Sequence, residues 1–93
     1  MRTYFKAPDA TKNYGIDWFD FIPDDQIMNN TWECDDGLTI ESYFTDGFTT
    51  VAWISGGTPG QAYYVYSTIT TFGGLSETRA FIVTIRPSIG ADE

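Results

Sequence analysis

The chain has 93 residues, of which 42% are hydrophobic and 17% aromatic. A chain of this length forms one domain with a thin core, and this composition excludes an intrinsically disordered protein. Thirteen acidic residues against five basic ones give a net charge of −8, which argues against partners that are nucleic acids or anionic membranes. No apolar run approaches the length of about 18 residues that a membrane span requires.

The first thirteen residues predict an extended arm outside the folded domain. They carry Tyr4 and Phe5 together with three of the five basic residues of the chain. Alternation of apolar and polar residues is weak here, and Pro8 argues against a strand in the middle of a sheet. The sequence therefore predicts an arm over 1–13.

Residues 14–86 have the pattern of an all-β domain. Turn-forming pairs such as Asp46-Gly47 and Gly73-Gly74 recur at short intervals, and runs of β-branched and aromatic residues lie between them. This spacing is typical of an antiparallel sandwich or barrel of six or seven strands. Strands are expected near 14–18, 27–34, 38–43, 48–55, 61–71 and 76–86. Pro87 ends the last strand, and residues 87–93 are expected to form a short polar tail.

Period-two alternation assigns side chains to the inner and outer faces of these strands, because neighbouring residues on a strand point to opposite sides. The predicted core consists of the bulky residues that share the inner face. Its members are Trp32, Cys34, Leu38, Ile40, Val51, Trp53, Tyr63, Val65, Ile69, Phe81, Val83 and Ile85.

The same parity leaves an apolar stripe on the opposite face, made of Tyr64, Tyr66 and Ile82. Tyrosine suits a surface that waits for a protein partner, since its ring buries a large area while its hydroxyl tolerates water. The stripe and the arm residues Tyr4 and Phe5 are therefore the predicted partner-binding residues. The alternative is that the arm lies across the stripe and covers it.

Catalysis and cofactor binding are not expected. The chain has no histidine, which is the commonest general base and metal ligand, and its single cysteine, Cys34, permits neither an internal disulfide nor a zinc site. One cysteine also suits assembly in a reducing cytoplasm. The glycine-rich run at 56–60 precedes a strand rather than a helix, so it is interpreted as a turn and not as a phosphate-binding loop.

The stretch "DWFDFIPDD" at 17–25 leaves two questions open. Its acidic residues are the strongest candidates for a calcium site, namely Asp17, Asp20, Asp24 and Asp25. Their spacing matches no established calcium loop, however, and no metal is expected. Its aromatic residues either form a lid over one end of the sandwich, with Trp18 and Phe21 inside, or belong to a surface that binds a partner.

The order of these features resembles a family of small bacteriophage virion proteins with an Ig-like β-sandwich, some of which are called fibre–tail adaptors. The resemblance is carried by "YGIDWFDFI", "NNTWEC", "FTTVAWISGGTPGQAYYVYSTITTFGG" and "SETRAFIVTIR", which together cover most of 14–86. It implies an Ig-like fold and a non-enzymatic structural role in the virion, as a tail-side adaptor that joins a fibre or tailspike to the tail body. The protein is then expected to be assembled in the host cytoplasm, to be present in several copies per particle, and to bind other virion proteins of the tail, fibre, tailspike or capsid. Two alternatives remain: a protein that decorates the capsid, and a carbohydrate-binding module that uses Tyr64, Tyr66 and a loop tryptophan as stacking platforms.

Overall fold

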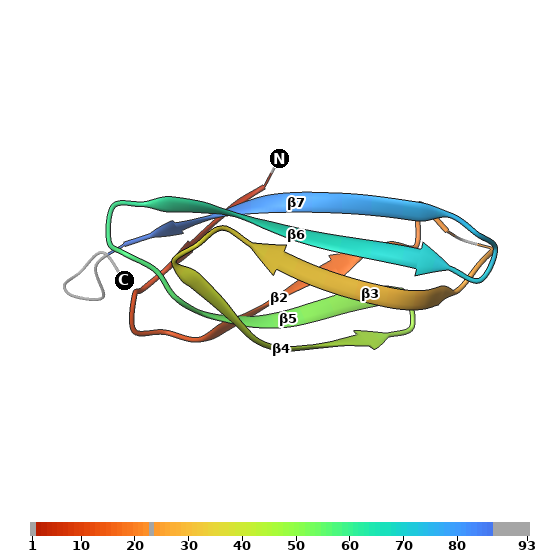
Figure 1. Ribbon diagram of the computed structural model, residues 1–93, viewed down its shortest axis with the longest axis horizontal. Coiled ribbons are helices and arrows are strands. Elements are labelled where there is room, and N and C mark those ends of the chain that lie inside the picture. Colours follow the sequence, from red (N-terminus) through yellow and green to blue (C-terminus); the bar gives the residue numbers. More distant parts are fainter. Residues whose placement is uncertain (1, 23, 87–93) are drawn as a thin grey trace.

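The computed structural model describes residues 2–22 and 24–86. Its seven strands form two sheets that face each other in a sandwich (Figure 1). The strands are β1 (Thr3–Lys6), β2 (Lys12–Asp17), β3 (Ile27–Cys34), β4 (Leu38–Asp46), β5 (Thr49–Gly56), β6 (Ala62–Thr71) and β7 (Ser76–Ile85). The predicted all-β, Ig-like sandwich is confirmed. The predicted tail, 87–93, lies outside the described residues.

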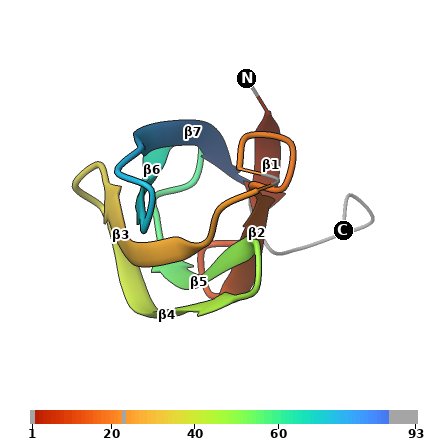
Figure 2. The ribbon, with the colours of Figure 1, turned by 90° about the vertical axis from the view of Figure 1, so that its right-hand side faces the viewer.

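One sheet has four strands in the order β1-β7-β6-β3, and the other has three in the order β2-β5-β4 (Figure 2). Every pairing is antiparallel except that of β1 with β7, which is parallel. Local sequence explains the tight turns: Gly47 has a φ of 62° between the paired Asp46 and Thr49. Glycine with a positive φ at the first position of a two-residue loop is the signature of a type II′ hairpin.

Two clusters of buried side chains hold the sheets together. The larger one fills the middle of the sandwich and contains Tyr14, Trp32, Leu38, Ala52, Ile54, Tyr63, Val65, Phe81, Val83 and Ile85. The smaller one closes the end beside the β2–β3 loop and contains Trp18, Ile22 and Ile69. Most of the predicted core is thus confirmed, and the apolar area that it removes from water is the main source of stability.

A buried chain of hydrogen bonds crosses from one sheet to the other. Trp18 Nε1 donates to Thr50 Oγ1 at 3.0 Å, and the hydroxyls of Thr50 and Ser67 lie 3.2 Å apart. Asn30 Nδ2 continues the chain by donating to Ser67 Oγ at 3.0 Å. Because a buried polar group without a partner is costly, this chain fixes one relative position of the two sheets.

The predicted inner and outer faces of β5 are reversed in the structure, so the assignment of Val51 and Trp53 to the core is wrong. Thr50, Ala52 and Ile54 are fully buried, whereas Trp53 is 39% exposed and Val51 only half-buried. The physical reason is that other strands supply the bulk that β5 was expected to bring. Trp18 needs the Thr50 hydroxyl, and Ala52 lies beside the large inward ring of Tyr14. Cys34 and Ile40, also assigned to the core, pack against it only half-buried.

The prediction that residues 1–13 lie outside the sandwich also needs correction. Thr3–Lys6 is β1, an edge strand that extends the four-stranded sheet along β7. Lys6 is buried, and its ammonium donates to the carbonyl oxygens of Ala7 and Ala10, both at 2.7 Å. Burial lowers the pKa of Lys6. A parallel edge strand of four residues has too short a pattern for alternation to reveal it.

Asp25, in the β2–β3 loop, contacts the β6–β7 turn, and this contact predicts that the stability of the fold depends on pH. Hydrogen bonds from the Thr71 hydroxyl and from the backbone N–H groups of Gln26 and Gly73 hold the pKa of Asp25 below its usual value. A carboxyl with a lowered folded-state pKa contributes stability above its unfolded pKa of about 3.9, and this stability is lost as pH falls through the folded value.

Asp25→Asn is therefore expected to lower the melting temperature at pH 7 and to leave it close to that of wild type near pH 2. Circular dichroism melts at both values measure this. The exposed neighbouring residue provides a control, Asp24→Asn, which should change the melting temperature little at either pH. An Asp25→Asn deficit of equal size at both values would show that the ionised carboxylate is not what stabilises the loop.

Candidate functional site

The outward side of β1, β7, β6 and β3, here called the four-stranded face, carries most of the predicted partner-binding residues. Alternation on β6 follows the prediction: Tyr63 is buried, and Tyr64 points outward with 43% of its surface exposed. Ile82 lies directly opposite Tyr64 across the β6–β7 pair. Tyr66 follows on the same side, its ring stacked 6.1 Å from that of Tyr64 with 17° between the planes. The two tyrosines and Ile82 form one continuous surface.

Phe5 extends this surface onto the edge strand. It points outward from β1, is 46% exposed, and lies opposite Thr84 in the register of β1 with β7. The guanidinium of Arg86 sits 3.6 Å from the centre of its ring, a cation–π contact that leaves a positive charge at this edge. The arm thus lies beside β7 and does not cover the outward tyrosines.

Tyr4, the fifth predicted residue, is not part of this surface. It points into the sandwich, where its ring packs 5.1 Å from that of Tyr14 and 5.3 Å from that of Phe81. Parity explains the separation, since Tyr4 and Phe5 are neighbours on one strand and must point to opposite sides. Tyr4 anchors β1 to the core, and this anchoring holds Phe5 in place.

The aromatic residues of the β2–β3 loop act mainly as a lid. Trp18 is fully buried, and Phe21 packs against the same end cluster with its ring 6.3 Å from the indole. Phe19 remains 49% exposed and packs edge-to-face on Phe48. Of the two interpretations of this stretch, the lid describes Trp18 and Phe21.

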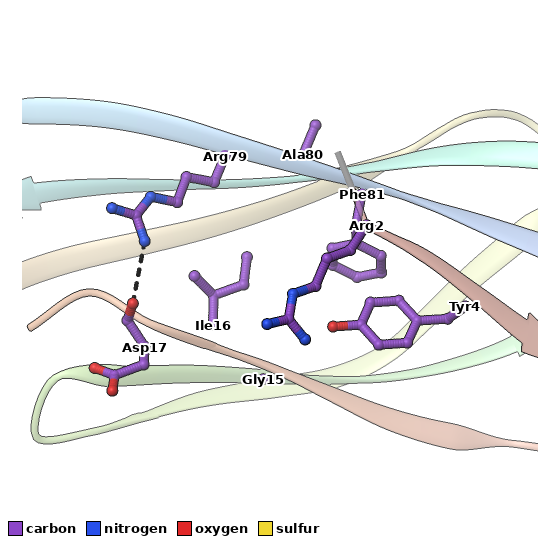
Figure 3. Close-up of a pocket in the computed structure, with 8 residues that line it drawn as sticks. All are labelled: Arg2, Tyr4, Gly15, Ile16, Asp17, Arg79, Ala80 and Phe81. Atoms are coloured by element: carbon purple, nitrogen blue, oxygen red, sulfur yellow. Dashed lines mark hydrogen bonds between the residues drawn. The ribbon is translucent and has the colours of Figure 1, made fainter. Parts of the chain in front are cut away.

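A cavity of about 380 Å³ lies at the side of the sandwich, between β1 and β7 of one sheet and β2 of the other (Figure 3). Arg79 closes one end: its guanidinium donates to the Asp17 carbonyl oxygen at 3.1 Å and lies 4.6 Å from the Trp18 ring centre. The side chain of Arg2 points into the cavity beside Tyr4 (Figure 3). Arg2 and Arg79 therefore both line the opening between the sheets, together with Asp17.

Two further findings concern only the residues that the structure describes. Within 2–22 and 24–86, no three His, Cys, Asp or Glu side chains gather as ligands for a metal ion. Nor does this part of the chain contain a helix long and apolar enough to cross a bilayer.

Comparison with known proteins identifies the class. The family described as "Podophage GP4 fiber-tail adaptor protein gp77" matches residues 6–84, which is most of the chain. No curated protein sequence is significantly similar. Among solved structures, the PKD domain from KIAA 1837 protein superposes with a TM-score of 0.62 at 18% identity, over 99% of this chain and 85% of that one.

At this identity the PKD domain supports the sandwich fold alone, whereas the family match bears on function. It favours a tail-side adaptor over the two alternatives that the sequence left open, a capsid-decorating protein and a carbohydrate-binding module. A fibre–tail adaptor is a non-enzymatic structural protein that binds tail and fibre proteins. The chain belongs to the podophage fibre–tail adaptor family and is a structural component of the virion tail.

Proposed function

We propose that the four-stranded face is a surface through which this adaptor binds a virion protein. The observation that carries the proposal is the continuous outward row of Tyr64, Tyr66, Ile82 and Phe5, drawn from three adjacent strands. Large aromatic residues exposed together on a small domain are typical of protein interfaces, where tyrosine is enriched. A sheet fixes the backbone that carries such side chains, so little backbone entropy is lost on binding.

We further propose that the adaptor is assembled in the host bacterial cytoplasm and is present in several copies per particle. Cys34 is a free thiol, and burial together with the nearby carboxylates of Asp35 and Asp36 raises its pKa. A thiol that stays protonated reacts slowly, which suits a protein that folds in a reducing compartment before it enters the particle.

The test of the four-stranded face is the double variant Tyr64→Ser with Tyr66→Ser. Both hydroxyl-bearing rings point away from the core, so the free energy of unfolding should change by no more than about 1 kcal/mol. Incorporation of the variant into particles should nevertheless fall at least about tenfold, because truncating a large aromatic side chain at an interface costs about 1–2 kcal/mol or more. Complementation of a phage that lacks the gene, followed by quantification of the adaptor in purified particles, measures this.

Phe72→Ser provides the matched control. Phe72 is 68% exposed in the β6–β7 turn and lies outside the four-stranded face. This variant should enter particles as wild type does. Normal incorporation of the double tyrosine variant, or its unfolding in isolation, would refute the proposed role of the face.

A further inference from the structure

A second apolar surface lies on the opposite side of the sandwich, on the outward side of β2, β5 and β4, here called the three-stranded face. Its centre is formed by Trp53, which is 39% exposed, Phe44, which is 50% exposed, and the half-buried Val51. Phe44 lies directly opposite Val51 in the β4–β5 register. On the other side of Val51 stands Gly15, which adds no side chain. Gly15 therefore leaves Val51 uncovered on its β2 side.

The outward position of Trp53 is imposed by the core. Thr50, Ala52 and Ile54 are each fully buried, and Thr50 is tied to Trp18 by a hydrogen bond. Turning Trp53 inward would require a one-residue shift of β5, which would bring all three of these side chains out. The fold thus holds a tryptophan on the surface, and tryptophan is the residue most enriched among those that dominate binding energy.

Carboxylates flank this apolar centre at both ends. Asp46 and Asp17 lie on either side of Thr49 at one end, where Thr49 pairs with both. At the other end Glu41 accepts a hydrogen bond from the Ser55 hydroxyl. None of the described residues that point outward from these three strands is basic. The four-stranded face differs, because it carries Arg86 over Phe5 at its edge.

We propose that the three-stranded face binds one of the two virion proteins that the adaptor joins, while the four-stranded face binds the other. This inference rests on the proposed function of the four-stranded face. Its occupant presents an apolar surface bordered by lysine and arginine, which complements Trp53 and Phe44 between their carboxylates. The two sheets face in opposite directions, so the adaptor holds its partners on its two sides (Figure 2).

The size of the domain permits both contacts at once. A standard protein–protein interface covers about 800 Å² on each partner. Two such contacts would take less than a third of the 5608 Å² of accessible surface. Joining two proteins needs two such surfaces that do not overlap, and the outward faces of a sandwich supply them.

The experiment compares two probes: particles purified without adaptor and fibre, and the purified fibre protein of the same phage. Full-length adaptor and its variants are titrated against each probe. Phe44→Ser with Trp53→Ser should weaken binding to one probe at least about tenfold and leave the other unchanged. Tyr64→Ser with Tyr66→Ser should weaken binding to the opposite probe, and Phe72→Ser should bind both as wild type does.

A second variant covers the case in which loss of Trp53 unfolds the protein. Phe44→Arg changes only a half-exposed side chain and places a positive charge against the basic rim of the partner, so it should reproduce the tenfold loss for the same probe. Asp46→Asn should weaken that binding about twofold to fivefold at low salt and less at high salt, because rim charges act mainly through screened attraction.

The outcomes separate this inference from the proposed function. If Phe44→Arg and the double Phe44 and Trp53 variant both bind each probe normally, or affect the same probe as the tyrosine variant, the inference is overturned. The inference is also overturned if sedimentation shows that the wild-type protein forms a dimer and that Phe44→Arg dissociates it. In that case the three-stranded face binds a second copy of the chain. If the tyrosine variant binds both probes normally while Phe44→Arg loses one, the three-stranded face is supported and the proposed function of the other face fails.

Discussion

Trp18→Ala is expected to lower the free energy of unfolding by about 3–5 kcal/mol. The indole is fully buried in the end cluster and donates its N–H to Thr50. Its removal leaves a cavity beside Ile22 and Ile69 and opens the hydrogen-bonded chain between the sheets. Since small domains are stable by about 5–15 kcal/mol in total, the loss takes a large share. Urea unfolding followed by circular dichroism measures it.

Trp53→Ala is the matched control, because it deletes the same side chain from an outward position. Its cost should be smaller than that of Trp18→Ala, since 39% of Trp53 is already in solvent and its removal from an outward position leaves no enclosed cavity. Trp18→Phe keeps most of the side-chain volume but loses the hydrogen bond to Thr50, so its loss of unfolding free energy should lie between those of the two alanine variants. This loss can still be measured if Trp18→Ala does not fold. Equal losses for the two alanine variants would contradict the assignment of inner and outer faces on β5.

Gly37→Ala is the second substitution with a large expected effect. Gly37 has a φ of 115°, where residues with a side chain are strained by about 1–3 kcal/mol. An added Cβ would also lie 2.5 Å from Tyr63 Cε1, and such overpacking costs about another 1–3 kcal/mol. Relief would require the ring to move, which would break the hydrogen bond that the Tyr63 hydroxyl accepts from Thr58 N–H at 3.0 Å.

Gly74→Ala separates the two contributions. Gly74 has a similar φ of 94°, but nothing lies within 4 Å of its added Cβ. The loss of unfolding free energy in Gly74→Ala should therefore reflect backbone strain alone. The loss in Gly37→Ala should be larger by about 1–3 kcal/mol in the same denaturation measurement. Indistinguishable losses would mean that the turn at Gly37 is not packed against Tyr63 as the structure has it.

Particular elements show why the fold was predictable and where prediction failed. On β6 the burial of side chains alternates along the whole strand, and on β7 it alternates from Ala80 to Ile85, so the inward Tyr63, Val65 and Ile69 and the outward Tyr64 followed from period two. On β5 the alternation allows two interpretations, Val51 with Trp53 or Ala52 with Ile54. The assignment of the bulkier pair, Val51 and Trp53, to the inner face was wrong, because Trp18, which is distant in sequence, already fills the space that β5 faces.

The predicted site shows the same limit. Tyr64, Tyr66 and Ile82 came together because they lie on paired strands whose parity the sequence reveals. Phe5 joined them only through a parallel pairing of β1 with β7 that no local pattern encodes. Phe44 was missed as a surface residue, since β4 runs three residues beyond its predicted end at 43. Non-local packing decided each of these cases.

A map of the assembled phage tail at side-chain resolution would show whether the four-stranded face is a docking surface. Atoms of another virion protein should contact Tyr64, Tyr66 and Ile82, with Phe5 at the edge of the contact. If the adaptor is held in the tail by other surfaces, with these four side chains open to solvent, the four-stranded face is not a docking surface.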